Sequence, residues 1–118
     1  MKGKYNLDKK FDSLEKEDIY ISEITLAELK FGISNSKAPS KNKKALSNFL
    51  TGIKILPIID ALDIYANEKA RLRKNGISVD DFDLLIGATA VTNDLILVTN
   101  NEKHFKRISE IKMENWIS

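Results

Sequence analysis

The stretch Val79–Asn101, VDDFDLLIGATAVTNDLILVTNN, decides how this chain folds. Its acidic start and the apolar positions that follow predict a helix that begins near Asp80 and ends at Asn93-Asp94. The next residues, Leu95–Thr99, are apolar and β-branched and predict a short buried strand. Open α/β sheets bind their ligands at the edge where such strands end. We therefore expect a polar site where this helix begins and this strand ends.

The composition is that of an ordinary folded domain. The 118 residues are 42% hydrophobic and 31% charged, which favours one globular domain over residues 1–118 and excludes a disordered chain. The net charge of +2 permits nucleic-acid binding without arguing for it. The chain has no cysteine, which excludes disulfides and thiolate metal sites.

Nothing in the sequence predicts a membrane association. No apolar run approaches the roughly 20 residues that a membrane-spanning helix needs. The N-terminus, MKGKYNLDKK, lacks the apolar core of a signal peptide. We therefore expect a cytoplasmic protein.

Short strands and helices alternate along the rest of the chain. Their order favours an α/β fold in which a mainly parallel sheet is covered by helices on both faces. The predicted elements are a short amphipathic helix at Leu7–Leu14, strands at Ile19–Ile21, Ile53–Leu56 and Lys112–Glu114, a helix from Thr25 that Gly32 loosens or ends, and helices at Lys41–Leu50 and Asp60–Lys74.

Carboxylates stand at the predicted starts of two helices, at Glu28 and Asp83. If the sheet is parallel these starts gather at one edge, and converging carboxylates suit a hard divalent cation such as Mg²⁺ or Mn²⁺. A simpler interpretation makes Thr25 and Glu28 a capping box. Acids in a first turn, such as Asp80 and Asp81, also offset the helix dipole. The spacing alone leaves both interpretations open.

Two other features favour simple surface roles. His104 lies between lysines and is expected to be a surface or packing residue rather than a ligand. The basic helix end at Lys69–Lys74 is expected to be a solvated face more than a phosphate contact.

Three ordered segments of the chain are similar to one known family. They are ISEITLAELKFGI (Ile21–Ile33), VDDFDLLIGATAVTNDLILVTNNEKHFKRI (Val79–Ile108) and IKMENWI (Ile111–Ile117). Together they resemble the PIN-domain ribonucleases, specifically the VapC-type toxins of bacterial toxin–antitoxin pairs. The resemblance implies a three-layer α/β/α fold with a parallel sheet and an endoribonuclease that depends on Mg²⁺ or Mn²⁺. It further implies an RNA substrate, commonly tRNA or rRNA, a small cognate antitoxin as partner, and a homodimer.

The resemblance also assigns roles to individual residues. Glu28, in T-L-A-E-L, and Asp83, in D-L-L-I, match the family's metal-site acids. Asp81 lies just upstream at a position that is often acidic, and is a third metal candidate. Asn101 stands where the family has Asp or Asn after its last main strand, and Thr99 is the small polar residue that often accompanies it. A metal-activated water would attack the RNA phosphodiester in line, leaving a 5′-phosphate and a 3′-hydroxyl.

The chain departs from the family pattern in two places. Gly87 replaces the usual alanine and is expected to allow close packing. The family also begins with an apolar strand that ends in Asp-Thr-Asn, and the Asp is a principal metal ligand. No such strand precedes Asp8 or Asp12, so we expect an N-terminally truncated domain without its central first strand and with one metal carboxylate fewer.

Two other functions compete with the toxin nuclease. The chain is also interpretable as a catalytically impaired PIN remnant that binds an antitoxin or dimerises, or as a metal-dependent DNA nuclease on the same fold. Comparing RNA and DNA substrates, and nuclease activity with antitoxin binding, separates these alternatives. In the nuclease the basic segments around Lys41–Lys44, Lys69–Lys74 and Lys103–Arg107 are expected to steer RNA.

Overall fold

The computed structural model describes residues 19–99 and 101–115. The predicted helix at Leu7–Leu14 and the anchor Trp116 lie outside them. Within this part of the chain, no helix is long and apolar enough to cross a membrane. The elements in chain order are β1 (Tyr20–Ser22), α2 (Glu23–Ser34), α3 (Pro39–Leu50), β2 (Lys54–Leu56), the 3-10 turn η2 (Ile59–Ala61), α4 (Leu62–Lys74), α5 (Asp81–Thr92), β3 (Ile96–Val98), α6 (Glu102–Phe105) and β4 (Lys112–Glu114).

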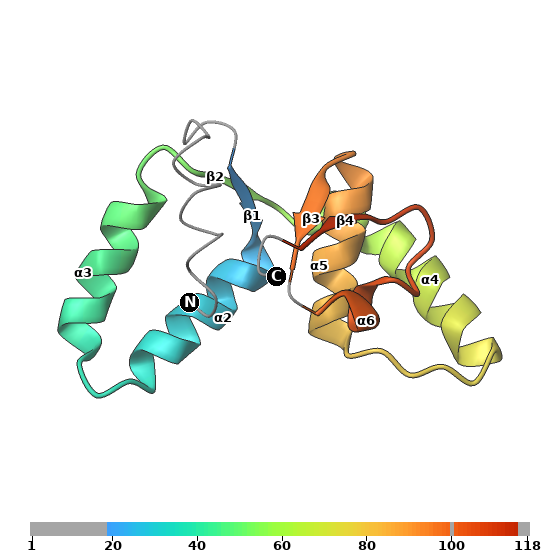
Figure 1. Cartoon of the computed structure of the whole chain (residues 1–118), viewed down its shortest axis with the longest axis horizontal. Coiled ribbons are helices and arrows are strands. Elements are labelled where there is room, and N and C mark those ends of the chain that lie inside the picture. The colour runs from blue at the N-terminus through green and yellow to red at the C-terminus, as the bar shows by residue number, and fades with distance from the viewer. Residues whose placement is uncertain (1–18, 100, 116–118) are drawn as a thin grey trace.

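The strands form two parallel pairs, β1 with β2 and β3 with β4 (Figure 1). In each pair the chain leaves one strand, passes through helical structure and returns in the same direction, as parallel pairing requires. The predicted parallel pairing is therefore confirmed, although the described residues hold two separate pairs and not one continuous sheet. Whether a central first strand is missing stays a prediction, because residues 1–18 lie outside this description.

Helix α5 joins the two strand pairs. It contacts one strand of each pair, β1 and β3, and also α2, η2, α4 and α6. Its buried residues are mostly small, including Gly87, Ala88 and Ala90, so neighbouring elements approach its backbone closely. The buried core cluster adds Leu84 to side chains from three other segments, namely Leu72, Phe105 and Ile108.

Among these small residues, Gly87 allows a particularly close approach of a neighbouring segment to the backbone of α5. A β-carbon at this position would collide with Cδ1 of Ile108 and would lie 3.5 Å from Cδ1 of Phe105. Ile108 is itself buried, with 2% of its surface exposed, so it has little room to withdraw. The predicted role of Gly87 in close packing is confirmed.

The start of α2 corrects one sequence-based interpretation. Ser22, the last residue of β1, is the N-cap, and its Oγ accepts a hydrogen bond of 3.0 Å from the backbone N–H of Thr25. The helix therefore begins at Glu23, so the predicted capping box between Thr25 and Glu28 is wrong. Glu28 lies in the second turn and is not needed as a cap. Gly32 does not end the helix either, since α2 continues to Ser34.

Other boundaries differ from the sequence-based prediction by small amounts. Helix α3 begins at Pro39, which fits the first helical turn because proline has no N–H to leave unpaired there. The predicted helix from Asp60 is divided into η2 and α4. The four-residue helix α6 was not predicted.

A buried carboxylate ties α4 to the segment before β4. Glu68 Oε1 accepts hydrogen bonds from the backbone N–H of Ser109 (2.6 Å) and from Arg71 Nη2 (2.9 Å). Arg71 Nη2 also donates to the backbone oxygen of Arg107 at 2.6 Å. The hydrogen bond from Arg71, with that from Ser109, lowers the pKa of Glu68 to about 2 although burial opposes the shift.

We predict that Glu68→Gln lowers the free energy of unfolding by about 1–3 kcal/mol at pH 7, because it removes a charge-assisted hydrogen-bond acceptor. The pKa of Glu68 is lower in the folded state, so the stability from its ionised form is present above pH 4.5 and is lost as pH falls toward 2. Urea unfolding from pH 2 to pH 7 measures this. The exposed Glu110→Gln variant is the control, and equal pH dependence in both variants would contradict the prediction.

Gly87→Ala tests the packing of α5 against Ile108. Alanine favours a helix, but we expect a net loss of about 1–3 kcal/mol because the added methyl group overpacks the core. Ile108→Val removes Cδ1, the atom in the way, so the double variant is expected to be more stable than the sum of the single changes predicts. Chemical unfolding of the four proteins measures the coupling. Additive changes would contradict this account.

Candidate metal centre

The first turn of α5 carries three aspartates with different surroundings. Asp80 is the N-cap, and its Oδ2 accepts a hydrogen bond of 3.2 Å from the backbone N–H of Asp83. Asp80 therefore caps the helix. The side chains of Asp81 and Asp83 contact different helices: Asp81 contacts α4 and Asp83 contacts α6.

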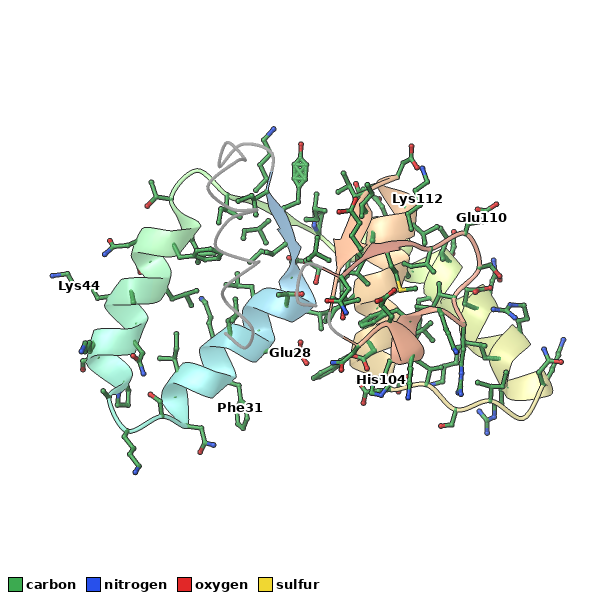
Figure 2. All side chains as sticks on the ribbon, viewed as in Figure 1. Glu28, Phe31, Lys44, His104, Glu110 and Lys112 are labelled. Carbon is green, nitrogen blue, oxygen red and sulfur yellow. The ribbon has the colours of Figure 1, made fainter. Side chains whose placement is uncertain are left out.

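Glu28 and Asp83 are brought together from distant parts of the sequence. Helix α2 contacts α5, and Glu28 lies on the side of α2 that faces α5 and α6 (Figure 2). Partial burial raises the pKa of Glu28, and the negative charges of Asp83 and Asp80 raise it further. These carboxylates are therefore close enough to repel one another, which disfavours the ionised form of Glu28.

His104 contacts one of these acids. Its Nδ1 lies 3.4 Å from Oδ2 of Asp83, and the two side chains are 62% and 25% exposed. The sequence predicted that His104 is a surface or packing residue, and it did not indicate this contact with Asp83. The short helix α6 begins directly after Asn101 and turns His104 back to the same edge, where its backbone N–H donates to the oxygen of Asn101. A predicted helix at this point would have indicated the contact.

Asp81 has a separate set of partners. Its Oδ1 accepts hydrogen bonds from Lys69 Nζ at 2.8 Å and from Tyr65 Oη at 2.9 Å. The bond from Lys69, followed by that from Tyr65, lowers the pKa of Asp81. The charges that raise the pKa of Glu28 are those of Asp83 and Asp80, and Asp81 is not among them. The structure thus groups Asp81 with α4 and not with Glu28.

Thr99 and Asn101 lie at the end of β3. The backbone N–H of Thr99 donates to the oxygen of Glu114 at 3.1 Å, which continues the pairing with β4. Its Oγ1 accepts from the backbone N–H of Asn101 at 2.9 Å. The side chain of Asn101 makes no capping hydrogen bond to α6. Thr99 therefore fixes the backbone at Asn101.

The Glu28–Asp83 pair fits a hard divalent cation. Mg²⁺ in proteins keeps several waters and is anchored by one or two carboxylates, and a cation between two carboxylates would relieve their repulsion. Across residues 19–99 and 101–115, no group of three or more histidine, aspartate or glutamate side chains is placed to hold a metal ion. A cation held by this pair would take its remaining ligands from water or from other oxygen atoms, such as substrate phosphates.

Comparisons with known proteins agree on one family. The family model described as PIN domain matches residues 3–111. The chain is 39% identical over 99 residues to Ribonuclease VapC2 of Rickettsia felis, covering 83% of this chain and 74% of that protein. It is 32% identical over 105 residues to the tRNA(fMet)-specific endonuclease VapC of Salmonella typhimurium, covering 88% and 80%.

A solved structure also matches closely. The crystal structure of DNA-bound VapBC from Salmonella typhimurium superimposes with a TM-score of 0.87 at 31% identity. The match covers 95% of this chain and 85% of that one. Nearly all of the chain thus has a counterpart in that fold.

We predict that Glu28→Gln and Asp83→Asn each weaken Mn²⁺ binding by about tenfold or more, because each removes one of the two anchoring carboxylates. Titration of the full chain followed by the electron paramagnetic resonance signal of free Mn²⁺ measures the affinity. Asp94→Asn is the matched control, since Asp94 pairs with Lys112 on another surface. The Asp81→Asn variant tests whether Asp81 is the third ligand. A loss of Mn²⁺ affinity as large as that of Asp83→Asn would place Asp81 in the site.

Proposed function

The chain belongs to the PIN-domain family, among the VapC ribonucleases, and on that premise we propose that it is a metal-dependent endoribonuclease, the toxin of a toxin–antitoxin pair, formed by one domain over residues 1–118. The observation that carries the proposal is the packing of α2 against α5, with Glu28 on the side of α2 that faces α5, because two nearby carboxylates suit a hard divalent cation. We take the cation to be Mg²⁺ or Mn²⁺.

Each residue of the site has a distinct task in this proposal. Glu28 and Asp83 hold the cation. When bound, a divalent cation lowers the pKa of a coordinated water and offsets negative charge on a phosphoryl oxygen. The contact with His104 orients the Asp83 carboxylate, and the hydrogen bond to Thr99 fixes the backbone that presents Asn101. Asp81 is engaged by Lys69, and its role as a ligand stays a prediction.

RNA is the proposed substrate. The relative from Rickettsia felis is named a ribonuclease, and that from Salmonella typhimurium a tRNA(fMet)-specific endonuclease. Exposed cations follow the site on and after α6, at Lys103, Lys106 and Arg107, where they favour the approach of a phosphate backbone. A tRNA or rRNA is the class of target that we propose, and the cytoplasm is the compartment.

Two protein partners belong to the proposal. The solved relative is a VapBC complex, and we propose that this chain likewise binds a small cognate antitoxin. Helix α2 exposes Leu29 and Phe31, apolar side chains of the kind that a partner helix covers. We also propose a homodimer, which is supported by exposed apolar side chains on the neighbouring elements η2, α4 and α5, at Ile59, Leu62 and Phe82.

We predict that the purified full chain cleaves tRNA or rRNA in the presence of Mg²⁺ or Mn²⁺ and leaves the corresponding DNA uncut. Glu28→Gln and Asp83→Asn are each expected to reduce the cleavage rate by about 100-fold or more, because they remove cation ligands rather than supporting groups. Gel analysis of the products with and without a chelator measures the rate. The Asp94→Asn variant is expected to cleave like the unaltered chain.

The competing function predicts a different pair of results. If the chain cuts no RNA under any of these conditions but binds its antitoxin, it is a binding module and the nuclease proposal is wrong. Cleavage that Glu28→Gln and Asp83→Asn leave intact would also contradict the proposal, since a different site would then perform the reaction.

A further inference from the structure

A pocket of about 420 Å³ lies between the second half of α4, the connection at 75–80 and the start of α5. Its apolar lining comes from Leu72, Ile77, Val79 and Leu84, of which Leu72 and Leu84 belong to the buried core. The base of the pocket is therefore formed by the buried core. Its volume falls within the range of roughly 300–1,000 Å³ that is typical of small-ligand sites.

Charged side chains form the rim of this pocket. Lys69 and Asp81 line it together, and their ion pair at 2.8 Å leaves this part of the rim without net charge. Tyr65 holds the pair in place through its hydrogen bond to Asp81. Arg73, one turn beyond Lys69 on α4, also lines the pocket, is exposed and has no ion pair among the described residues. The rim thus offers one unbalanced positive charge beside an apolar floor.

The pocket adjoins the candidate metal centre. Asp81 lines the pocket, and Asp83, on the same turn of α5, faces Glu28 and His104. The start of α5 therefore lies between the pocket and the candidate metal centre. A molecule that reaches from one to the other needs an anionic group, an apolar planar group and a short flexible connection between them.

A single-stranded nucleotide has this combination of groups. Proteins bind splayed-out bases of single-stranded RNA in apolar pockets and contact the neighbouring phosphates with cations. We propose that this pocket binds one nucleobase of the RNA substrate next to the cleaved phosphodiester, with Arg73 contacting the adjoining phosphate. This proposal rests on the nuclease function proposed above and assigns to the Lys69–Asp81 pair the role of a pocket wall.

The test measures RNA binding separately from cleavage. The full chain with Glu28→Gln is titrated into a fluorescein-labelled single-stranded RNA. Fluorescence anisotropy then gives the dissociation constant of the complex. We expect Arg73→Gln to raise this constant by about tenfold, because a phosphate contact and its counterion release are lost. Lys74→Gln is the matched control, since it removes the same charge from the adjacent exposed residue outside the pocket, and is expected to raise the constant by less than about threefold.

A second variant tests the base itself. In a series of RNAs with one abasic nucleotide each, one position is expected to weaken binding by about tenfold, since a bound base contributes roughly 1–3 kcal/mol. Ser78→Trp places a large side chain on the exposed connection that lines the pocket. In this variant the abasic nucleotide at the sensitive position is expected to weaken binding no more than an abasic nucleotide elsewhere in the RNA. The temperature of thermal unfolding is expected to stay unchanged.

The outcomes separate this proposal from the nuclease function. Equal effects of Arg73→Gln and Lys74→Gln, or an abasic pattern that Ser78→Trp leaves unchanged, would overturn the nucleobase pocket even if the chain cleaves RNA. A Ser78→Trp variant that loses only self-association or antitoxin binding would also overturn it, in favour of a protein interface. The expected binding pattern without any cleavage by the unaltered chain would support the pocket and refute the nuclease.

Discussion

Helix α5 packs its small buried residues so closely against its neighbours that Ile108 occupies the space above Gly87. That contact fixes the segment carrying α6 against α5, and the same helix also touches α2 and β1. The two strand pairs share no ladder within the described residues, so α5 is the element that sets their relative position. The site depends on α5, because Asp83 lies on this helix and Glu28 lies on α2, which packs against it.

The three aspartates at the start of α5 have three different roles. Asp80 caps the helix, Asp81 pairs with Lys69 of α4, and Asp83 meets Glu28 and His104. Acids in a first turn are favoured by the helix dipole in general, so their number alone says little about function. Their partners distinguish them: Asp83 lies beside other carboxylates, an arrangement that suits a cation, whereas Asp81 already has lysine and tyrosine as hydrogen-bond donors.

Local sequence patterns predicted the elements of this fold better than its contacts. The helix across Asp81–Thr92 and the parallel pairing depend on spacing and end residues, which a sequence displays directly. The capping box failed because Ser22, at the end of β1, begins the helix three residues earlier than Thr25 would. The partners of Asp81 and the contact of His104 were missed because both depend on how separate helices dock, which periodicity does not encode.

The central claim is that Glu28 and Asp83 form the metal site while Asp81 belongs to the wall of the neighbouring pocket. Anomalous diffraction from crystals of the chain soaked in Mn²⁺ tests this claim most directly. We predict a peak within coordination distance of the Glu28 and Asp83 carboxylates, with the Lys69–Asp81 pair intact. A peak coordinated by Asp81 with Lys69 displaced, or one that touches neither Glu28 nor Asp83, would contradict it.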